Sequence, residues 1–355
     1  ADADFAEELS NSGEHEKLGA LDEQGPVDEE AAFAEALDRK RKRPVRRARA
    51  PRAAVPAAAA AATAASTPRP RPPQPRPPAN ELAPAGPAQS RDLPTAVLTG
   101  LIVAIGALIC FKQGPAWTTA LAALVVGIAG LEFCAALRSK GLRTATLLAF
   151  VACLTIPVAA YNYGTNAYPM FFGLVAVFTM LWFLWEVTPG RPLIGVATTV
   201  LAFAYVGGLG GFSGLLLARP SGVGLILGVV LCVIAYDVAG FFVGSQWGRT
   251  PIAPKVSPNK SVQGTVGGMA ASIIVGTVLV GQIHPWDAKW GFLLGCLVAI
   301  GAFLGDLCES MIKRDIGLKD FGTLLPGHGG VLDRFDGLLF CLPIAYYLAV
   351  AAKLV

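Results

Sequence analysis

The sequence contains little charge. Only 15% of its 355 residues are Asp, Glu, Lys or Arg, whereas 54% are hydrophobic. An average soluble domain contains about 25% charged residues, and the mean hydropathy of this chain is positive. The composition therefore excludes an ordinary soluble protein and indicates an integral membrane protein.

Closely spaced cysteine pairs are absent from the sequence, and histidines are few. The chain has seven Cys and three His, it contains no CxxC pair, and its cysteines lie in or beside apolar runs. These absences argue against a zinc site and against a disulfide framework. We therefore expect the cysteines to be small buried hydrophobic residues.

Residues that could enter a core are rare in the first 90 positions. This stretch has an acidic start, a basic block at Arg39–Arg52 and an Ala/Pro tract ending in "PRPRPPQPRPP". We predict a disordered tail over residues 1–90 and a membrane domain over residues 91–355. The acidic start lacks an apolar segment, so no signal peptide is expected. Beside a membrane domain, the basic block favours a cytoplasmic topology signal or contact with anionic lipid over nucleic-acid binding.

Long apolar runs fill the rest of the chain. They are of a length that crosses about 30 Å of hydrocarbon as a helix. The sequence therefore predicts an all-α polytopic membrane protein with about nine transmembrane helices. The fifth is the least regular, because "YVGGLGGFSG" at Tyr205–Gly214 could break a helix. The runs cover residues 94–111, 116–137, 142–160, 168–186, 192–217, 222–244, 264–281, 290–308 and 335–353.

The distribution of Lys and Arg predicts the orientation. With the basic tail in the cytoplasm, the loops after spans two, four, six and eight also face the cytoplasm, and the other loops face outward. The outer set is Lys112, Arg219, Lys289 and Lys353. The larger, inner set is Arg138, Lys140, Arg143, Arg191, Arg249, Lys255, Lys260, Lys313, Arg314, Lys319 and Arg334.

Several carboxylates lie in or at the ends of the apolar runs, where an unpaired charge is costly. Asp306 and Glu309 are three residues apart, and Asp333 and Asp336 repeat that spacing. On helices, each pair would share one face. Together with Asp237, they could bind a hard cation such as Mg²⁺ through oxygen atoms.

Ion pairing is the alternative explanation for these carboxylates. Lys313, Arg314 and Arg334 are near enough in sequence to neutralise them as structural partners. Several carboxylates on one membrane side favour the metal site over this alternative. Glu132 is a weaker candidate, because it lies near a helix end and could simply reach the interface.

Two loops have the composition of phosphate-binding segments. "PGHGG" at Pro326–Gly330 would let backbone N–H groups approach an anion at a helix start, with His328 beside them. "APKVSPNKSVQG" at Ala253–Gly264 spaces lysines and hydroxyls through a Pro/Gly loop, although it would equally pass as a positive-inside loop. Cations, carboxylates and membrane depth together indicate phosphoryl or nucleotidyl transfer on a lipid phosphate.

The segment "SMIKRDIGLKDFGTLLPGHGGVLDRFD" at Ser310–Asp336 resembles the signature of the phosphatidate cytidylyltransferase family, also called CDP-diacylglycerol synthases. Every fixed position of S-x-x-K-R-x4-K-D-x5-P-G-H-G-G-x-x-D-R-x-D is matched. "GDLCES", the "APKVSPNKSVQG" loop and the element at Asp237 also match in order and spacing. Gln263 departs from the Glu of many members, and "YDVAGFF" lacks a frequent Tyr; both departures concern substrate contacts only.

The resemblance implies that CTP and phosphatidate give CDP-diacylglycerol and pyrophosphate in a bacterial cytoplasmic membrane. It also implies a homodimer and a Mg²⁺ site on Asp306, Asp333 and Asp336 with a K⁺ ion nearby. We expect a phosphatidate oxygen to attack the α-phosphorus in line. The expected catalytic residues are Asp237, Asp306, Asp320, His328, Asp333, Arg334 and Asp336. The expected substrate-binding residues are Lys255, Ser257, Lys260, Ser261, Ser310, Lys313, Arg314 and Lys319.

Other functions remain open from the residues alone. The intact signature argues against a polyprenol kinase, and an archaeal-lipid cytidylyltransferase would differ in its acceptor. In a transporter or channel, charges would spread through the membrane depth, whereas these are expected on one side. An inactive scaffold is a further alternative. Acyl-chain preference, the choice between CTP and dCTP and the role of the tail are not readable from the sequence.

Overall fold

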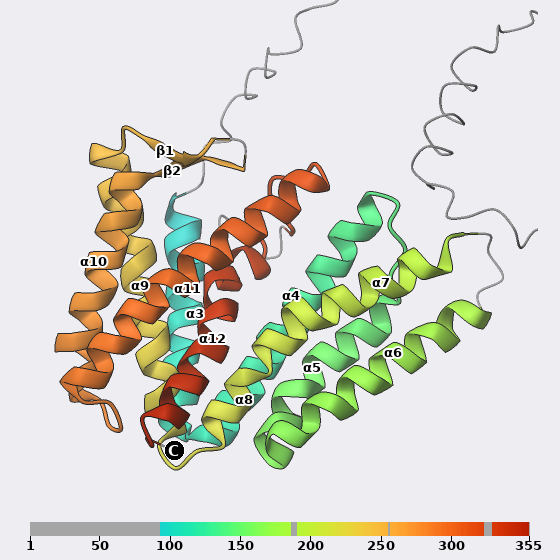
Figure 1. The fold of residues 1–355 in the computed structure, drawn as a ribbon, viewed down its shortest axis with the longest axis horizontal. Coiled ribbons are helices and arrows are strands. Elements are labelled where there is room, and N and C mark those ends of the chain that lie inside the picture. The colour runs from blue at the N-terminus through green and yellow to red at the C-terminus, as the bar shows by residue number, and fades with distance from the viewer. Residues whose placement is uncertain (1–92, 186–189, 255, 323–328, 355) are drawn as a thin grey trace, which may run out of the picture. The chain divides into compact units, whose positions relative to one another are not determined.

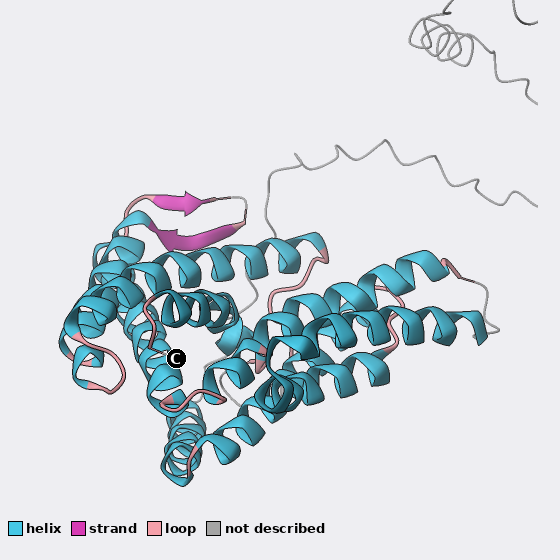
Figure 2. Ribbon diagram, turned by 60° about the horizontal axis from the view of Figure 1, so that its bottom comes forward, coloured by secondary structure: helices cyan, strands magenta, loops and turns pink. Residues whose placement is uncertain are grey.

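The computed structural model describes residues 93–185, 190–254, 256–322 and 329–354. The predicted tail, Lys255 and His328 therefore lie outside the described residues. Within them, the chain is a set of apolar helices with one short β-hairpin (Figures 1 and 2). The helices are α3 (Leu93–Gln113), α4 (Pro115–Ser139), α5 (Thr146–Tyr163), α6 (Ala167–Trp185), α7 (Pro192–Ala202), α8 (Phe212–Leu217), α9 (Gly222–Trp247), α10 (Val262–Val278), α11 (Ala288–Asp315) and α12 (Leu332–Ala351).

The helical membrane architecture predicted from the sequence is confirmed. By length and composition, 7 helices of the described part of the chain could cross a membrane. One of them, Thr146–Trp185, contains both α5 and α6, which are joined by the 3₁₀ turn η1 (Gly164–Asn166). The helix α3 adds a shorter apolar segment, Leu98–Gln113. Each of the nine predicted runs thus corresponds to a helical segment, and the number that cross the membrane is approximate.

The glycine-rich fifth run stays helical. Between α7 and α8 the chain forms a π-helical segment, η2 (Phe203–Gly208), so the break that this stretch could have made does not occur. Glycine is needed here for close packing: a Cβ atom on Gly214 would lie 1.9 Å from the carbonyl oxygen of Pro157 in α5. The glycines therefore allow the fifth span to contact α5 directly.

The hydrophobic core consists of two clusters. One includes Leu225, Val229, Leu294 and Val298 and lies between α9, α11 and α12. The other joins α4, α5 and η2 to the first residue of α12, Leu332, which is fully buried. The helix α12 therefore links the two clusters, and its first turn is fixed by α4 as well as by α11.

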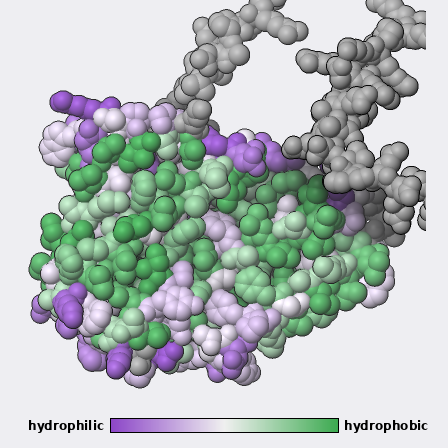
Figure 3. Space-filling view, in the orientation of Figure 1, coloured by the Kyte–Doolittle hydropathy of each residue, from purple (hydrophilic) through white to green (hydrophobic). Residues whose placement is uncertain are grey.

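The polar segments gather at the ends of the helices. Figure 3 shows a broad band of hydrophobic side chains with hydrophilic ones above and below it. The C-terminal ends of α4, α9 and α11 lie at one end with the hairpin, and the C-terminus lies at the other (Figure 1). A hydrogen bond of 3.2 Å from Lys140 Nζ to the carbonyl oxygen of Gly317 joins two loops of the first end.

The hairpin occupies a segment that the sequence predicts to be an irregular loop. Its strands β1 (Pro251–Ala253) and β2 (Ser257–Ser261) are antiparallel, with Pro251 opposite Ser261 and Ala253 opposite Ser257. Proline and turn residues hide so short a strand pair from pattern analysis. The consequence for the site is that β2 holds Lys260 and Ser261 at the start of α10.

Candidate active site

A polar cleft of about 650 Å³ opens between α9, α10, α11 and α12. Four helices and β2 contribute to it, so residues from 236 to 336 meet in one place. Gly240, Gly244 and Gly264 keep α9 and α10 close together along its floor: a Cβ atom on Gly264 would lie 2.8 Å from the Gly240 carbonyl oxygen. The charged and hydroxyl-bearing residues that line it are Tyr236, Asp237, Ser245, Lys260, Ser261, Thr265, Asp306, Glu309, Ser310, Asp333, Arg334 and Asp336.

The two predicted carboxylate pairs meet across the α11–α12 contact. Asp306 and Glu309 lie on α11, whereas Asp333 and Asp336 lie on the first turns of α12, and all four line the cleft. The side chain of Asp333 is only 4% exposed. Its Oδ2 accepts hydrogen bonds from the amides of Gly330 at 2.9 Å and Phe321 at 3.2 Å. These bonds tie Phe321 and Gly330, two residues within the signature segment, to the first turn of α12.

Lysines neutralise part of this negative charge. Lys313 Nζ lies 2.8 Å from Glu309 Oε1 and 2.8 Å from Asp333 Oδ1. Lys260 Nζ contacts Asp306 Oδ2. The alternative of structural ion pairs is therefore realised for these carboxylates, and it coexists with their position in the cleft. A polyphosphate that enters the cleft would therefore meet lysine side chains that are already paired with carboxylates.

Lys260 is the cation that the hairpin brings into the cleft. Its side chain is 28% exposed. Burial lowers the pKa of the Lys260 ammonium, and the neighbouring carboxylates of Asp336, Asp237 and Glu309 partly oppose this effect. The hydroxyl of Ser261 accepts a hydrogen bond of 3.1 Å from Gly264 N and caps α10. The strand thus fixes Lys260 relative to the first turn of α10.

The cleft contains most, but not all, of the predicted site residues. Eight of them line it: Asp237, Lys260, Ser261, Asp306, Ser310, Asp333, Arg334 and Asp336. Lys313 contacts two of the acids that line the cleft. Ser257, Arg314, Lys319 and Asp320 do not line it; the last three are exposed, and Arg314 donates a 3.1 Å hydrogen bond from Nε to the carbonyl oxygen of Val256. Lys255 and His328 lie outside the described residues.

The described residues contain no group of three or more His, Cys, Asp or Glu side chains arranged to hold a metal ion. The oxygen donors of the cleft nevertheless suit Mg²⁺ chemically. Mg²⁺ commonly binds through one or two carboxylates together with substrate phosphates, without a cage made wholly of protein. The predicted ligands Asp306, Asp333 and Asp336 fit that arrangement, because all three line one cleft beside cations that could bind phosphate.

Some residues of the cleft were not in the predicted set. Glu309 stands out in the sequence through its spacing from Asp306, whereas Tyr236 and Thr265 have no charge to mark them. Glu132 of α4 is also part of the surroundings: its Oε2 accepts a 2.9 Å hydrogen bond from Leu332 N at the start of α12. Only the fold reveals that contact, because the two residues are 200 positions apart.

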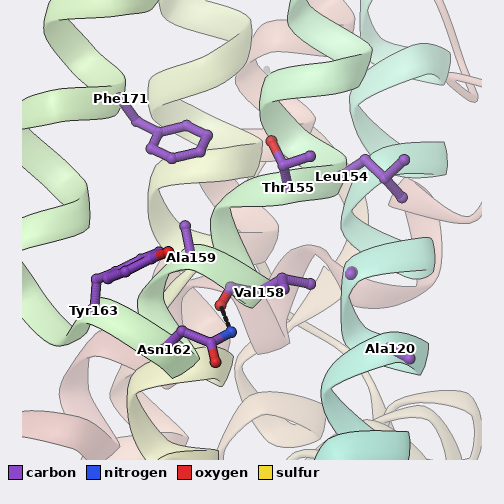
Figure 4. A pocket seen from close by; sticks show the side chains of 9 residues that line it. Ala120, Leu154, Thr155, Val158, Ala159, Asn162, Tyr163 and Phe171 are labelled. Atoms are coloured by element: carbon purple, nitrogen blue, oxygen red, sulfur yellow. Dashed lines mark hydrogen bonds between the residues drawn. The ribbon is translucent and has the colours of Figure 1, made fainter.

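A second cavity, of about 510 Å³, is lined by residues of α4, α5 and α6. Figure 4 shows mainly hydrocarbon side chains around it, among them Leu154, Val158 and Phe171, with Asn162 bonded to the Val158 carbonyl oxygen at 2.8 Å. Its lining contains no charged side chain, so it could not stabilise a phosphate. The cleft between α9 and α12 is therefore the candidate active site.

The fold and the cleft together define a mainly helical, multi-pass membrane protein with a charged cleft between α9, α10, α11 and α12. Comparison with known proteins identifies the family. Residues 94–352 match the model of the cytidylyltransferase family. The chain therefore belongs to that family and is a nucleotidyltransferase.

Named relatives agree with the family match. The chain is 34% identical to the phosphatidate cytidylyltransferase of Mycobacterium bovis over 277 residues, which is 74% of this chain and 88% of the relative. It is 32% identical to that of Mycobacterium leprae over 279 residues, covering 73% of this chain and 88% of the relative. A shorter match, 41% identical over 137 residues, joins it to the phosphatidate cytidylyltransferase of Synechocystis and covers 37% of this chain and 45% of the relative.

Proposed function

We propose that this protein transfers a cytidylyl group from CTP to phosphatidate, giving CDP-diacylglycerol and pyrophosphate. The observation that carries the proposal is the cleft in which Asp306, Asp333, Asp336, Lys260 and Arg334 meet between membrane helices. A lipid phosphate and a polar nucleotide can both reach such a place. The relatives from Mycobacterium bovis and Mycobacterium leprae are named phosphatidate cytidylyltransferases, which supports the choice of substrates.

In the proposed reaction, a phosphatidate oxygen attacks the α-phosphorus of CTP. A new P–O bond forms as the bond to the leaving pyrophosphate breaks. A phosphate monoester is already largely ionised near neutral pH, because its second pKa is about 6. The protein therefore needs no strong general base, and its main tasks are to align the two phosphates and stabilise charge.

The residues of the cleft divide these tasks between them. Lys260 and Arg334 line the cleft and would bind phosphate oxygens as charge moves to the leaving group. Ser261 and Ser310 offer hydroxyl groups beside them. Lys313 holds Asp333 in place through its 2.8 Å ion pair.

We propose Mg²⁺ as the resident ion, held by oxygens of Asp306, Asp333 and Asp336 in combination with the triphosphate. Bound there, it would neutralise phosphate charge and orient the leaving group. In the protein without bound ligands, Lys260 balances the negative charge of Asp306 and Lys313 balances that of Asp333.

We further propose that the cleft faces the cytoplasm, where CTP is made, and that the protein resides in a bacterial cytoplasmic membrane as a homodimer. The C-terminal ends of α4 and α11 lie at the end with the hairpin (Figure 1), and Lys140, which follows α4, bonds Gly317, which follows α11. Positive charge in short loops favours the cytoplasmic side. The variant Lys319→Cys tests this orientation in intact cells with a membrane-impermeant, cysteine-reactive label. Protection of residue 319 from the label supports the orientation, and labelling contradicts it.

The reaction is tested by measuring pyrophosphate release from CTP by purified protein with Mg²⁺ and phosphatidate. Wild type is compared with Asp333→Asn and with a sample lacking lipid. Lipid-dependent, CTP-selective release that the substitution abolishes supports the proposal. Activity only with a polyprenol-type or ether-lipid acceptor would keep the family and change the substrate. Absence of release with every lipid would favour a transporter or a scaffold.

A further inference from the structure

Glu132 connects α4 to the first turn of α12. It lies on α4, it is 8% exposed, and its Oε2 accepts a 2.9 Å hydrogen bond from the amide of Leu332. A charged side chain in this apolar surrounding therefore bonds the backbone at one particular place, the start of α12.

The first turn of α12 needs such a partner. Its N-cap residue is Val331, whose side chain cannot accept a hydrogen bond, and no side-chain cap bond is formed there by the cap residue itself. The free amides at a helix start favour a negative group. The carboxylate of Glu132 supplies it from another helix. The same first two turns carry Asp333, Arg334 and Asp336.

The surrounding chain is shaped to admit this carboxylate. A Cβ atom on Gly322 would lie 2.5 Å from Glu132 Oε1, and one on Gly330 would lie 2.8 Å from Glu132 Oε2. Side chains at either position would therefore displace it. The next residue of α4, Phe133, packs its ring 5.2 Å from that of Phe321. The helix α4 thus contacts the signature segment at Phe321, Gly322 and Gly330, close to the start of α12.

We propose that Glu132 is a positioning residue for the cytidylyl transfer: it caps α12 and thereby fixes Asp333, Arg334 and Asp336 relative to α11. The inference rests on the proposed function. The charge-assisted bond between Glu132 and the amide of Leu332 sets the depth and rotation of α12 in the cleft. Without that bond, the first turn of α12 loosens while the rest of the helix stays packed in its core cluster.

The variants Glu132→Ala and Glu132→Gln test the proposal, with Thr119→Val as the control. Thr119 is a buried residue of the same helix, 3% exposed, and its hydroxyl bonds the carbonyl oxygen of Pro115 at the opposite end of α4 from Glu132. We expect Glu132→Ala to lower kcat about 10²-fold, the cost of a misplacement of about 1 Å, with a smaller change in the KM for CTP. Glu132→Gln keeps an acceptor oxygen and should recover part of the loss, whereas the control should keep wild-type kcat.

Hydrogen–deuterium exchange supplies a readout that does not depend on the reaction. Peptides covering 329–336 should exchange faster in Glu132→Ala than in wild type or the control, while peptides from α9 and α10 stay unchanged. Wild-type kcat and exchange in folded Glu132→Ala would overturn the proposal, as would faster exchange throughout the protein.

If Glu132→Ala fails to fold, the same comparison is made with Glu132→Gln, whose lost charge should still speed exchange at 329–336. If wild type itself releases no pyrophosphate, the proposed function fails and the exchange result alone decides the role of Glu132.

Discussion

Lys313 Nζ lies 2.8 Å from Asp333 Oδ1, and this ion pair joins α11 to the first turn of α12. The ammonium also contacts Glu309 one helical turn earlier, again at 2.8 Å. The side chains of Glu309 and Asp333 are only 5% and 4% exposed. One cation therefore compensates two acids that have little access to water, and it bridges α11 to α12.

Replacing Lys313 with Met should destabilise the protein and abolish turnover. The change leaves two buried carboxylates without their cation, and breaking a buried pair costs about 3–5 kcal/mol. Thermal unfolding in detergent and pyrophosphate release measure the two effects. Lys289→Met is the matched control, because Lys289 is exposed at the other end of the same helix. An equal loss of stability in both variants would contradict the assignment.

The charged part of the site was predictable from local spacing. Asp306 with Glu309, and Asp333 with Asp336, are separated by one helical turn, and the structure places all four around one cleft. The choice between metal binding and ion pairing was not predictable from spacing alone. It depends on which lysines reach the acids, and Lys260 reaches Asp306 from a hairpin that the sequence did not indicate.

Contacts between distant segments set the limit of sequence analysis. The nine apolar runs appear as helices because hydrophobic length and helical rise are local properties. Glu132 looked like a residue near the interface, since nothing local marks its partner 200 positions away. Likewise, the π-helical path of Phe203–Gly208 follows from tertiary packing of glycines that alone would indicate a break.

Removing Mg²⁺ should stop the reaction, and Asp306→Asn should raise the Mg²⁺ concentration needed for half-maximal rate. The substitution replaces a charged oxygen donor with a neutral one and weakens the proposed ion site. Titrating Mg²⁺ after treatment with EDTA measures the shift. Asp315→Asn is the control, because Asp315 is an exposed carboxylate at the end of the same helix. Identical Mg²⁺ dependence in wild type and Asp306→Asn would remove Asp306 from the proposed ligand set.

Gly264→Ala should destabilise the protein and raise the KM for CTP. The new Cβ atom would lie 2.8 Å from the Gly240 carbonyl oxygen and 2.9 Å from Gly244 Cα, and backbone atoms cannot move aside cheaply. Overpacking of this kind typically costs about 1–3 kcal/mol. In contrast, Gly173→Ala in α6 has no atom within 4 Å of the added Cβ and should be neutral or slightly stabilising. Thermal unfolding in detergent measures the stability of both variants, and steady-state kinetics measure their KM for CTP. Equal unfolding temperatures for the two variants would show that α9 and α10 can separate without cost.

Deleting residues 1–90 should leave kcat and the KM for CTP unchanged in detergent. The family match begins at residue 94, and the cleft is built wholly from residues 236–336. The basic block Arg39–Arg52 should matter only where anionic lipid is present, because its attraction is electrostatic and is screened by salt. The deletion is therefore compared in detergent and in vesicles containing phosphatidylglycerol, with a deletion of residues 1–38, which keeps the basic block, as the control. A large loss of kcat in detergent, in a protein that unfolds at the wild-type temperature, would assign the tail a direct part in the reaction.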